Sequence, residues 1–229
     1  KNIITSCLLL AGIAFLALPT NGESAQSLQS CDTNPPIIYF QDGFETALQW
    51  KTEILLGSAD PWSIFSFETF YFLYGQDLPS ASLACKTMIV DVAFPPGAYL
   101  HFLHKYDFDA YCLGGQCSEF YDGGVVEYST TGGTTWNDAG PLFVDYGYNA
   151  TIISYSGNPN PLGGRAAFSG ETLTFIESQA DLSALAGHNV RFRFCIGTDD
   201  YNEGTLYGWV IDEVLIDIVE TAAPQLPHQ

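Results

Sequence analysis

The sequence has 229 residues, which is enough for one large β domain or two small ones. Lys and Arg together number 7 against 26 Asp and Glu, and the net charge of -19 makes nucleic acid and anionic membranes poor partners. The apolar share of 47% and the aromatic share of 14% exclude a disordered chain, because they supply a sizeable core.

Residues 1–25 have the pattern of a secretory signal peptide. After a positive start, an apolar run extends from Cys7 to Leu18, and cleavage is plausible after Ala25. The run is too short for a transmembrane helix, and the alternatives are an uncleaved anchor or a buried helix. We expect a secreted, extracellular protein that has no membrane contact once this segment is removed. A polar leader over residues 26–36 follows.

From residue 37 onward, short apolar runs are separated by Gly, Pro, Asn and Asp, and no segment keeps a helical period for three turns. This pattern predicts an all-β sandwich or jelly roll in one domain over residues 37–220, with a flexible tail over residues 221–229. A single helical turn is expected at Leu182–Gly187. The expected strands are Met88–Phe94, Tyr99–Phe108, Val125–Thr130, Leu142–Tyr146, Thr151–Tyr155, Leu173–Gln179, Asn189–Ile196 and Tyr207–Ile218.

Five cysteines remain after the signal segment, and an oxidising compartment favours their pairing. Cys112 and Cys117 flank Leu-Gly-Gly-Gln, a span that can close a tight loop, so we expect this disulfide. A zinc site is the weaker alternative, since no His or second Cys pair is near in sequence. Cys195 lies in an apolar pattern and is compatible with a buried thiol. A bond between Cys31 and Cys85 is compatible with the sequence but cannot be deduced from it.

Two aromatic segments are expected to serve the fold. Residues Ser129 to Trp136 have the spacing of an Asp-box, with Thr131 in place of the Asp. This predicts a β-hairpin in which Gly133 takes a positive φ and Trp136 packs as a large apolar plug.

The second segment, Trp62 to Tyr74, is dense in rings. Because Phe65 and Phe67 alternate with serines, we expect them to face the core. Tyr71 or Tyr74 is then the ring expected to be exposed.

The order of several motifs resembles the MAM-like jelly-roll domains of secreted bacterial proteins, above all the accessory domain of immune inhibitor A-type metallopeptidases. The resemblance covers roughly residues 37–219 and implies an all-β, two-sheet antiparallel jelly-roll β-sandwich, often with a structural calcium ion and an adhesive or docking role. In that family the peptidase would be a separate domain, and this chain has no H-E-x-x-H, so the zinc protease chemistry is absent from it. The motifs are Asp42-Gly43-Phe44-Glu45 with Trp50 and Trp62, then Tyr121 to Ser129, Asp181 to Gly187, Val190 to Phe194 and Gly208 to Val214.

Calcium prefers about six to eight oxygen ligands, several of them from carboxylates. In a jelly roll the first and last strands lie side by side, so carboxylates from the two ends of the domain can converge. The resemblance matches Glu45 and Asp212 to acidic motif positions, although Glu213 stands where the family has a second Asp. Asp42, Asp107 and Asp122 are candidates for further ligands. The alternative is that all five are solvated turn and edge residues.

Enzyme chemistry is not expected. His101 and His104 are three apart on a predicted strand, so they point to opposite faces and cannot form a two-His metal pair. The sequence contains no G-x-S-x-G and no Cys/His signature. We therefore expect a secreted, non-catalytic, calcium-stabilised module that attaches to glycan or cell-surface partners. The alternative is a structural protein that assembles with itself, as a homo-oligomer, filament or surface layer.

Overall fold

The computed structural model describes residues 36–45, 49–154, 157, 159–201 and 208–218. Within these ranges the chain is built almost entirely of antiparallel strands, with two single-turn 3-10 helices at Gly140–Leu142 and Ser183–Leu185. The signal peptide, Cys31 and the C-terminal tail expected from the sequence lie outside the described residues. No helix of the described part is long and apolar enough to cross a membrane.

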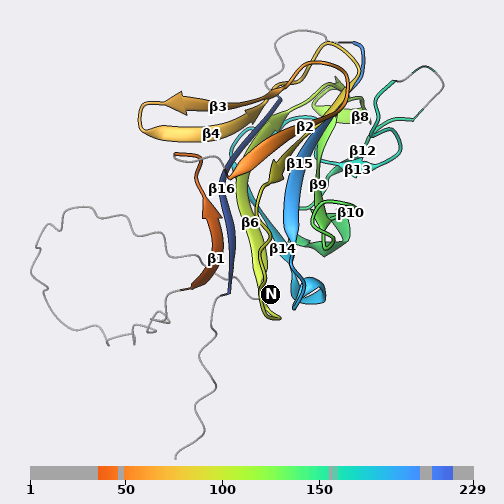
Figure 1. Cartoon of the computed structure of the whole chain (residues 1–229). Coiled ribbons are helices and arrows are strands. Elements are labelled where there is room, and N and C mark those ends of the chain that lie inside the picture. Colours follow the sequence, from red (N-terminus) through yellow and green to blue (C-terminus); the bar gives the residue numbers. More distant parts are fainter. Residues whose placement is uncertain (1–35, 46–48, 155–156, 158, 202–207, 219–229) are drawn as a thin grey trace, which may run out of the picture. The chain divides into compact units, whose positions relative to one another are not determined.

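One sheet has seven strands and contains both the first and the last strand of the domain (Figure 1). Its order is β11-β14-β6-β16-β4-β3, and β1 pairs with the same edge of β16 as β4 because β6 occupies the other edge. The strands are β1 (Ile37–Asp42), β3 (Trp62–Phe67), β4 (Phe70–Gly75), β6 (Tyr99–Asp107), β11 (Phe143–Asp145), β14 (Ile176–Asp181) and β16 (Gly208–Ile218).

The second sheet has five strands in the order β10-β9-β15-β5-β2. They are β2 (Trp50–Leu56), β5 (Ser82–Met88), β9 (Gly123–Ser129), β10 (Asn137–Asp138) and β15 (Arg191–Thr198). Two short ribbons complete the described structure: β7 (Ala110–Leu113) pairs with β8 (Gln116–Phe120), and β12 (Ala150–Thr151) pairs with β13 (Ala166–Ala167).

The main core lies between the two sheets. Phe102 of β6 meets Phe194 of β15 with ring centroids 5.2 Å apart, and Phe194 meets Trp209 of β16 edge-on at 5.6 Å. All three are fully buried. Gly124 of β9 lies against the same indole, where a Cβ would approach a Trp209 ring carbon to 2.4 Å. A glycine at this position therefore lets the two sheets close over Trp209.

A smaller core covers the outer face of the five-stranded sheet. The disulfide Cys85–Cys195 joins directly opposed residues of β5 and β15, and Ile152 and Leu162 from the segment around β12 pack over it. The interpretation of Cys195 as a free core thiol was wrong, because its partner lies across the sheet and not nearby in sequence. Because Cys85 is bonded to Cys195, it cannot also bond to Cys31.

The predicted fold class is confirmed as an all-β, antiparallel two-sheet sandwich. The long strands β6 and β16 match their predicted ranges to within one residue at each end. The strand expected at Met88–Phe94 was wrong: β5 ends at Met88, and beyond it Val92 makes an isolated bridge to Val190. The disulfide expected between Cys112 and Cys117 is present and spans the β7–β8 ribbon.

Candidate functional site

A break in the pairing of β16 creates the first candidate site. β4 pairs with β16 up to Ile211 and β1 pairs with it from Val214, so the two strands leave a gap between them on one edge. On the opposite edge the register with β6 shifts between Asp212 and Leu215. Glu213 has a positive φ of 49°, which is uncommon for a residue other than glycine. This geometry is that of a β-bulge, which re-aims side chains at the end of regular pairing.

Asp42 at the end of β1 holds the loop that carries Glu45. Its Oδ1 accepts the backbone N–H of Phe44 at 2.8 Å, and its Oδ2 accepts the indole N–H of Trp50 at 2.9 Å. Asp42 is buried, and Phe44 has a positive φ of 65°. This carboxylate therefore fixes a constrained turn and anchors Trp50 in the core, and Glu45 is presented at the surface.

The negative charge of Glu45 acts on Asp212, the residue with which the sequence pattern predicted it to converge. Asp212 is half-buried, and burial, followed by the negative charges of Glu213 and Glu45, raises its pKa to about 6. A hollow of about 250 Å³ at this place is lined by Gln41, Asp42, Gly43, Glu45, Gln49 and Glu213. None of these lining residues is basic. We call the group of Asp42, Glu45, Asp212 and Glu213 the β1–β16 acidic site.

Asp107 and Asp122, the other two predicted ligands, lie elsewhere. Asp107 ends β6, where burial and then the charge of Glu171 raise its pKa. Asp122 precedes β9 and is buried beside Asp77. In the described part of the chain, no three His, Cys, Asp or Glu side chains are grouped so that they could hold a metal ion as they stand. Calcium binding therefore stays a prediction.

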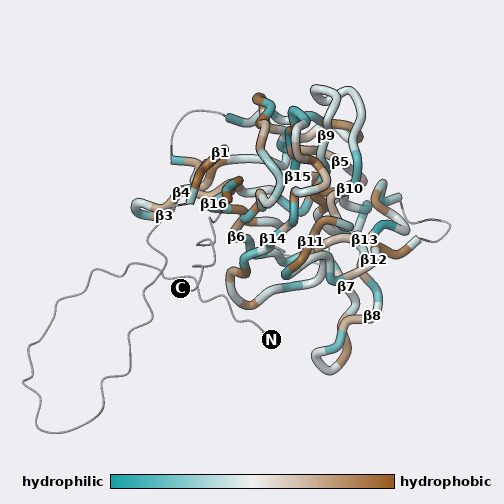
Figure 2. The backbone as a smooth tube through the Cα atoms, turned by 90° about the horizontal axis from the view of Figure 1, so that it is seen from below, coloured by the Kyte–Doolittle hydropathy of each residue, from teal (hydrophilic) through white to brown (hydrophobic). Residues whose placement is uncertain are grey.

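The β3–β4 hairpin is the second candidate site, and it corrects the aromatic prediction. Only residues 73–75 of β4 pair with β16, and beyond them β3 and β4 pair only with each other. The hairpin extends away from both sheets (Figures 1 and 2). Phe65 and Phe67 were expected in the core, but they are 56% and 63% exposed. Tyr71 and Tyr74 are only partly exposed.

The exposed tip of this hairpin carries three phenylalanines, Phe65, Phe67 and Phe70, on one face and Ile64 on the other. Phe67 pairs with Phe70 at the turn and Phe65 pairs with Phe72 behind it. Phe72 stacks on Phe175 with ring centroids 6.1 Å apart. We call the exposed residues Ile64, Phe65, Phe67 and Phe70 the β3–β4 tip.

The hairpin between β9 and β10 has the predicted turn but not the predicted plug. Gly133 has a φ of +88°, and Thr131 Oγ1 accepts the N–H of Thr135 at 2.9 Å, in the position that an Asp-box gives to its Asp. Trp136, however, is half-buried and lies under the guanidinium of Arg193, whose Cζ is 4.1 Å from the ring centroid. The ring is therefore a cation–π partner at the sheet surface and not a core residue.

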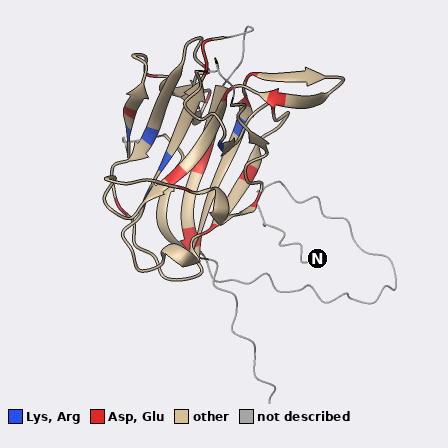
Figure 3. Ribbon diagram, turned by 90° about the vertical axis from the view of Figure 1, so that its right-hand side faces the viewer, with Lys and Arg blue, Asp and Glu red and all other residues tan. Residues whose placement is uncertain are grey.

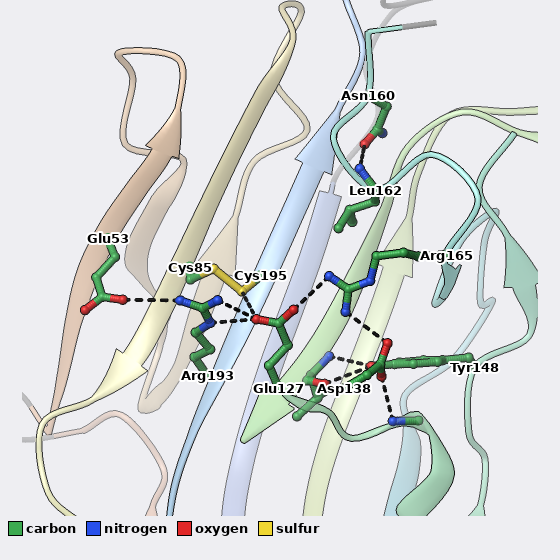
Figure 4. A network of polar contacts seen from close by, with 12 residues as sticks. Glu53, Cys85, Glu127, Asp138, Tyr148, Asn160, Leu162, Arg165, Arg193 and Cys195 are labelled. Carbon is green, nitrogen blue, oxygen red and sulfur yellow. Dashed lines mark hydrogen bonds and ion pairs between the residues drawn. A yellow bond between two sulfur atoms is a disulfide. The ribbon is translucent and has the colours of Figure 1, made fainter. Parts of the chain in front are cut away.

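Arg193 also belongs to an ion-pair network that stabilises the outer face of the five-stranded sheet (Figure 4). Glu127 of β9 is shared by two arginines: its Oε2 accepts from Arg193 Nε at 2.7 Å and its Oε1 accepts from Arg165 Nη1 at 2.7 Å. Arg165 also donates to Asp138 at 2.9 Å, and Arg193 also contacts Glu53 at 3.5 Å. The network uses its charges internally, so it offers no free cation for a ligand.

The two histidines of β6 lie on opposite faces, as their spacing predicted. His104 is fully buried; its Nδ1 accepts the indole N–H of Trp209 at 3.1 Å, so its Nε2 carries the proton toward Ser178 Oγ at 2.8 Å. Burial lowers the pKa of His104 to about 3. His101 points outward and lies 3.1 Å from Asp217.

Acidic side chains are spread over both sheets and their loops, and basic ones are few (Figure 3). No family model matches the sequence, and no curated protein matches it. Similar solved structures include the K1 and K3 cleaved adhesin domains of Lys-gingipain from Porphyromonas gingivalis W83. Each is 16% identical and the match covers 79% of this chain and 98% of that domain, with TM-scores of 0.43 and 0.44. Similarity at this level carries no functional conclusion, and the MAM-like resemblance stays a prediction beyond the β-sandwich.

Proposed function

We propose that the chain is a secreted, non-catalytic binding module that attaches to glycan or cell-surface partners through the β3–β4 tip. The observation that carries the proposal is the exposure of Ile64, Phe65, Phe67 and Phe70 on a hairpin that leaves the sandwich. Large apolar patches on soluble domains mark interaction sites, because leaving them in water is unfavourable. Two disulfides support an oxidising, extracellular location.

The chemistry of the tip favours an uncharged partner. Aromatic rings offer flat apolar faces to sugar rings or to the apolar surface of another protein. Ser66, between Phe65 and Phe67 in sequence, places its hydroxyl on the opposite face of β3, and Glu68 in the turn is acidic. Since the whole protein carries a net charge of -19, polyanionic glycans and anionic lipids would be repelled.

The test compares matched serine substitutions at two exposed apolar places. Phe65→Ser with Phe67→Ser should remove most binding on an array of neutral glycans and on cell surfaces, with little change in melting temperature. Val144→Ser on β11, which is 59% exposed at the far edge of the same sheet, is the control and should bind as the parent does. Equal binding by the parent and the Phe65/Phe67 variant would show that the tip is not the contact surface.

Calcium at the β1–β16 acidic site is the structural part of the proposal. Asp42, Glu45 and Asp212 supply hard oxygen ligands of the kind calcium prefers, and no basic residue lines the adjacent hollow. A bound ion would link the loop after β1 to the bulge of β16 and would add its binding free energy to folding. We expect chelator to lower the melting temperature of the parent and Ca²⁺, but not Mg²⁺, to restore it. A Glu45→Gln/Asp212→Asn variant that responds to chelator as strongly as the parent would refute this assignment.

Self-assembly is the second candidate function, and the position of β3 favours it. β3 is the last strand of the seven-stranded sheet, so one row of its backbone N–H and C=O groups is unpaired within the sheet order. An edge strand with exposed apolar side chains is a template for pairing with a second copy. Size-exclusion chromatography and electron microscopy separate the two functions. Filaments that disappear in the Phe65/Phe67 variant would favour assembly, and a monomer that binds glycan would favour attachment.

A further inference from the structure

A cavity at one end of the sandwich belongs neither to the β3–β4 tip nor to the β1–β16 acidic site. Its volume is about 580 Å³, and it lies where β6 and β15 end and β9 begins. Gly197 of β15 lies opposite Gly123 of β9, so the segments that continue from these two strands are neighbours there. The aromatic and charged residues described in the lining are Tyr111, Tyr121, Tyr201, Asp109, Asp199 and Asp200. Rings and carboxylates from separate segments therefore line one space.

The β7–β8 ribbon supplies one wall of the cavity, including Tyr111 and Cys112. The ribbon pairs with neither sheet and extends from the sandwich (Figure 2). Its disulfide to Cys117 closes a very short loop, which in the loop-entropy model adds only about 2 kcal/mol to stability. The bond does, however, hold the ribbon in one conformation, and a preorganised loop loses less entropy when it binds a partner. Tyr111 and, at 75% exposure, Leu113 give this wall an exposed apolar surface.

The segment that follows β15 supplies another wall. The backbone N–H of Asp199 donates to Oδ1 of Asp122 at 2.6 Å, and the Oδ1 of Asp199 accepts the N–H of Tyr201 at 2.7 Å. These two bonds fix the turn that carries Asp200 and Tyr201, both of which are exposed. Burial raises the pKa of Asp199, the bond from Tyr201 opposes this effect, and the charge of Asp200 adds to it. A positive group at this wall would therefore be favourable for both carboxylates.

The chain brings no positive charge of its own to this cavity. The stretches of sequence that contain the lining residues, 106–126, 149–164 and 194–218, include no Lys, Arg or His. The net charge of -19 draws cations from solvent. A metal ion fits poorly, because no three potential ligand side chains of the described residues are grouped to hold one, and because the space is much larger than an ion. An organic cation can use the rings and the carboxylates together.

We propose that this cavity binds an arginine side chain of a partner protein, as a second contact surface that is independent of the β3–β4 tip. A guanidinium group is flat, stacks on aromatic faces and donates paired hydrogen bonds to carboxylates. Asp200 is the exposed carboxylate for this contact, and Tyr111 and Tyr201 are the exposed rings. Leu113 adds apolar surface for the residues that flank the arginine. Lysine fits less well, because its ammonium group is compact and strongly hydrated.

Fluorescence anisotropy of a labelled Gly-Arg-Gly-Gly-Arg-Gly peptide with the full chain tests the proposal. The same peptide with citrulline, the neutral counterpart of arginine, should not bind. Asp200→Asn should weaken binding of the arginine peptide about fivefold. Tyr111→Leu, which leaves the net charge unchanged, should weaken it about threefold. Asp145→Asn is the matched control, because it removes the same charge from an exposed position on β11 at the far edge of the seven-stranded sheet, and it should bind as the parent does.

Three outcomes would overturn the proposal. Equal losses in Asp200→Asn and Asp145→Asn would show that the peptide is attracted only by the overall negative charge. Unchanged binding by Tyr111→Leu would show that the cavity wall does not contact the arginine. Binding of a neutral glycan that Tyr111→Leu abolishes, with no binding of the arginine peptide, would make the cavity a sugar site. The Phe65→Ser/Phe67→Ser variant should bind the peptide as the parent does, so a failure of the β3–β4 tip proposal is recognised separately.

Discussion

Removing the disulfide Cys85–Cys195 should destabilise the domain far more than removing Cys112–Cys117. The first joins residues 110 apart in sequence and the second joins residues 5 apart. In the loop-entropy model these separations correspond to about 5 and about 2 kcal/mol at 25 °C. Whole domains have free energies of unfolding of roughly 5–15 kcal/mol, so losing the Cys85–Cys195 bond would remove a large part of the stability of this domain. The melting temperature should fall by roughly 10–20 °C.

The assay is urea unfolding followed by tryptophan fluorescence on two double variants, Cys85→Ala/Cys195→Ala and Cys112→Ala/Cys117→Ala. Because Cys85 and Cys195 are fully buried, alanine also leaves a small cavity. The control is parent protein that is unfolded, reduced and then refolded with dithiothreitol. It lacks the disulfides but keeps the sulfur atoms, so it separates the loss of the cross-link from the effect of the cavity. Free energies of unfolding that differ by less than 1 kcal/mol between the two variants would refute the reasoning.

Three further substitutions test individual side-chain contacts of the fold. Glu127→Ala should cost about 3 kcal/mol in a urea titration because it leaves Arg165 and Arg193 without their shared carboxylate, and Glu127→Gln should cost less. Trp136→Ala should cost about 2 kcal/mol, below the roughly 3–5 expected for a core ring, and a larger loss would restore the plug interpretation. His104, whose folded pKa of about 3 lies below its unfolded value, stays neutral in the fold while the unfolded chain takes up a proton, so stability falls as pH drops from about 6.5 toward 3. The free energy of unfolding of the parent, minus that of His104→Gln, should fall by up to about 1.4 kcal/mol per pH unit over this range. A difference that does not change with pH would show that this assignment is wrong.

The sequence predicts best the strands that pack one face on the core. β6 alternates buried and half-exposed residues from Tyr99 to Asp107, and its predicted range was right to within one residue. β3 shows the opposite case. Beyond Trp62 both of its faces are exposed, so alternation with serine carried no information about burial. The early strands β1 to β4 were not predicted individually, because their apolar residues follow no single buried face.

Long-range pairing explains the remaining differences. One topological expectation, that the first and last strands are neighbours, was confirmed, because β1 pairs with β16. No such rule brought Asp77 to Asp122 or Cys85 to Cys195. Each is a single residue in its own segment, and only the register of strands far apart in sequence places it beside its partner.

The basic residues of the chain are occupied away from the β1–β16 acidic site. Each of the three arginines of the sequence is ion-paired: Arg165 and Arg193 share Glu127, and Arg191 binds Asp91. No basic residue lines the hollow at the β1–β16 acidic site. Monovalent salt screens exposed charges but reaches buried ones poorly. If calcium binds there as proposed, sodium chloride should recover only a small part of the stability that chelator removes, whereas Ca²⁺ should recover all of it; full recovery with sodium chloride would show that general screening and not a bound ion is responsible.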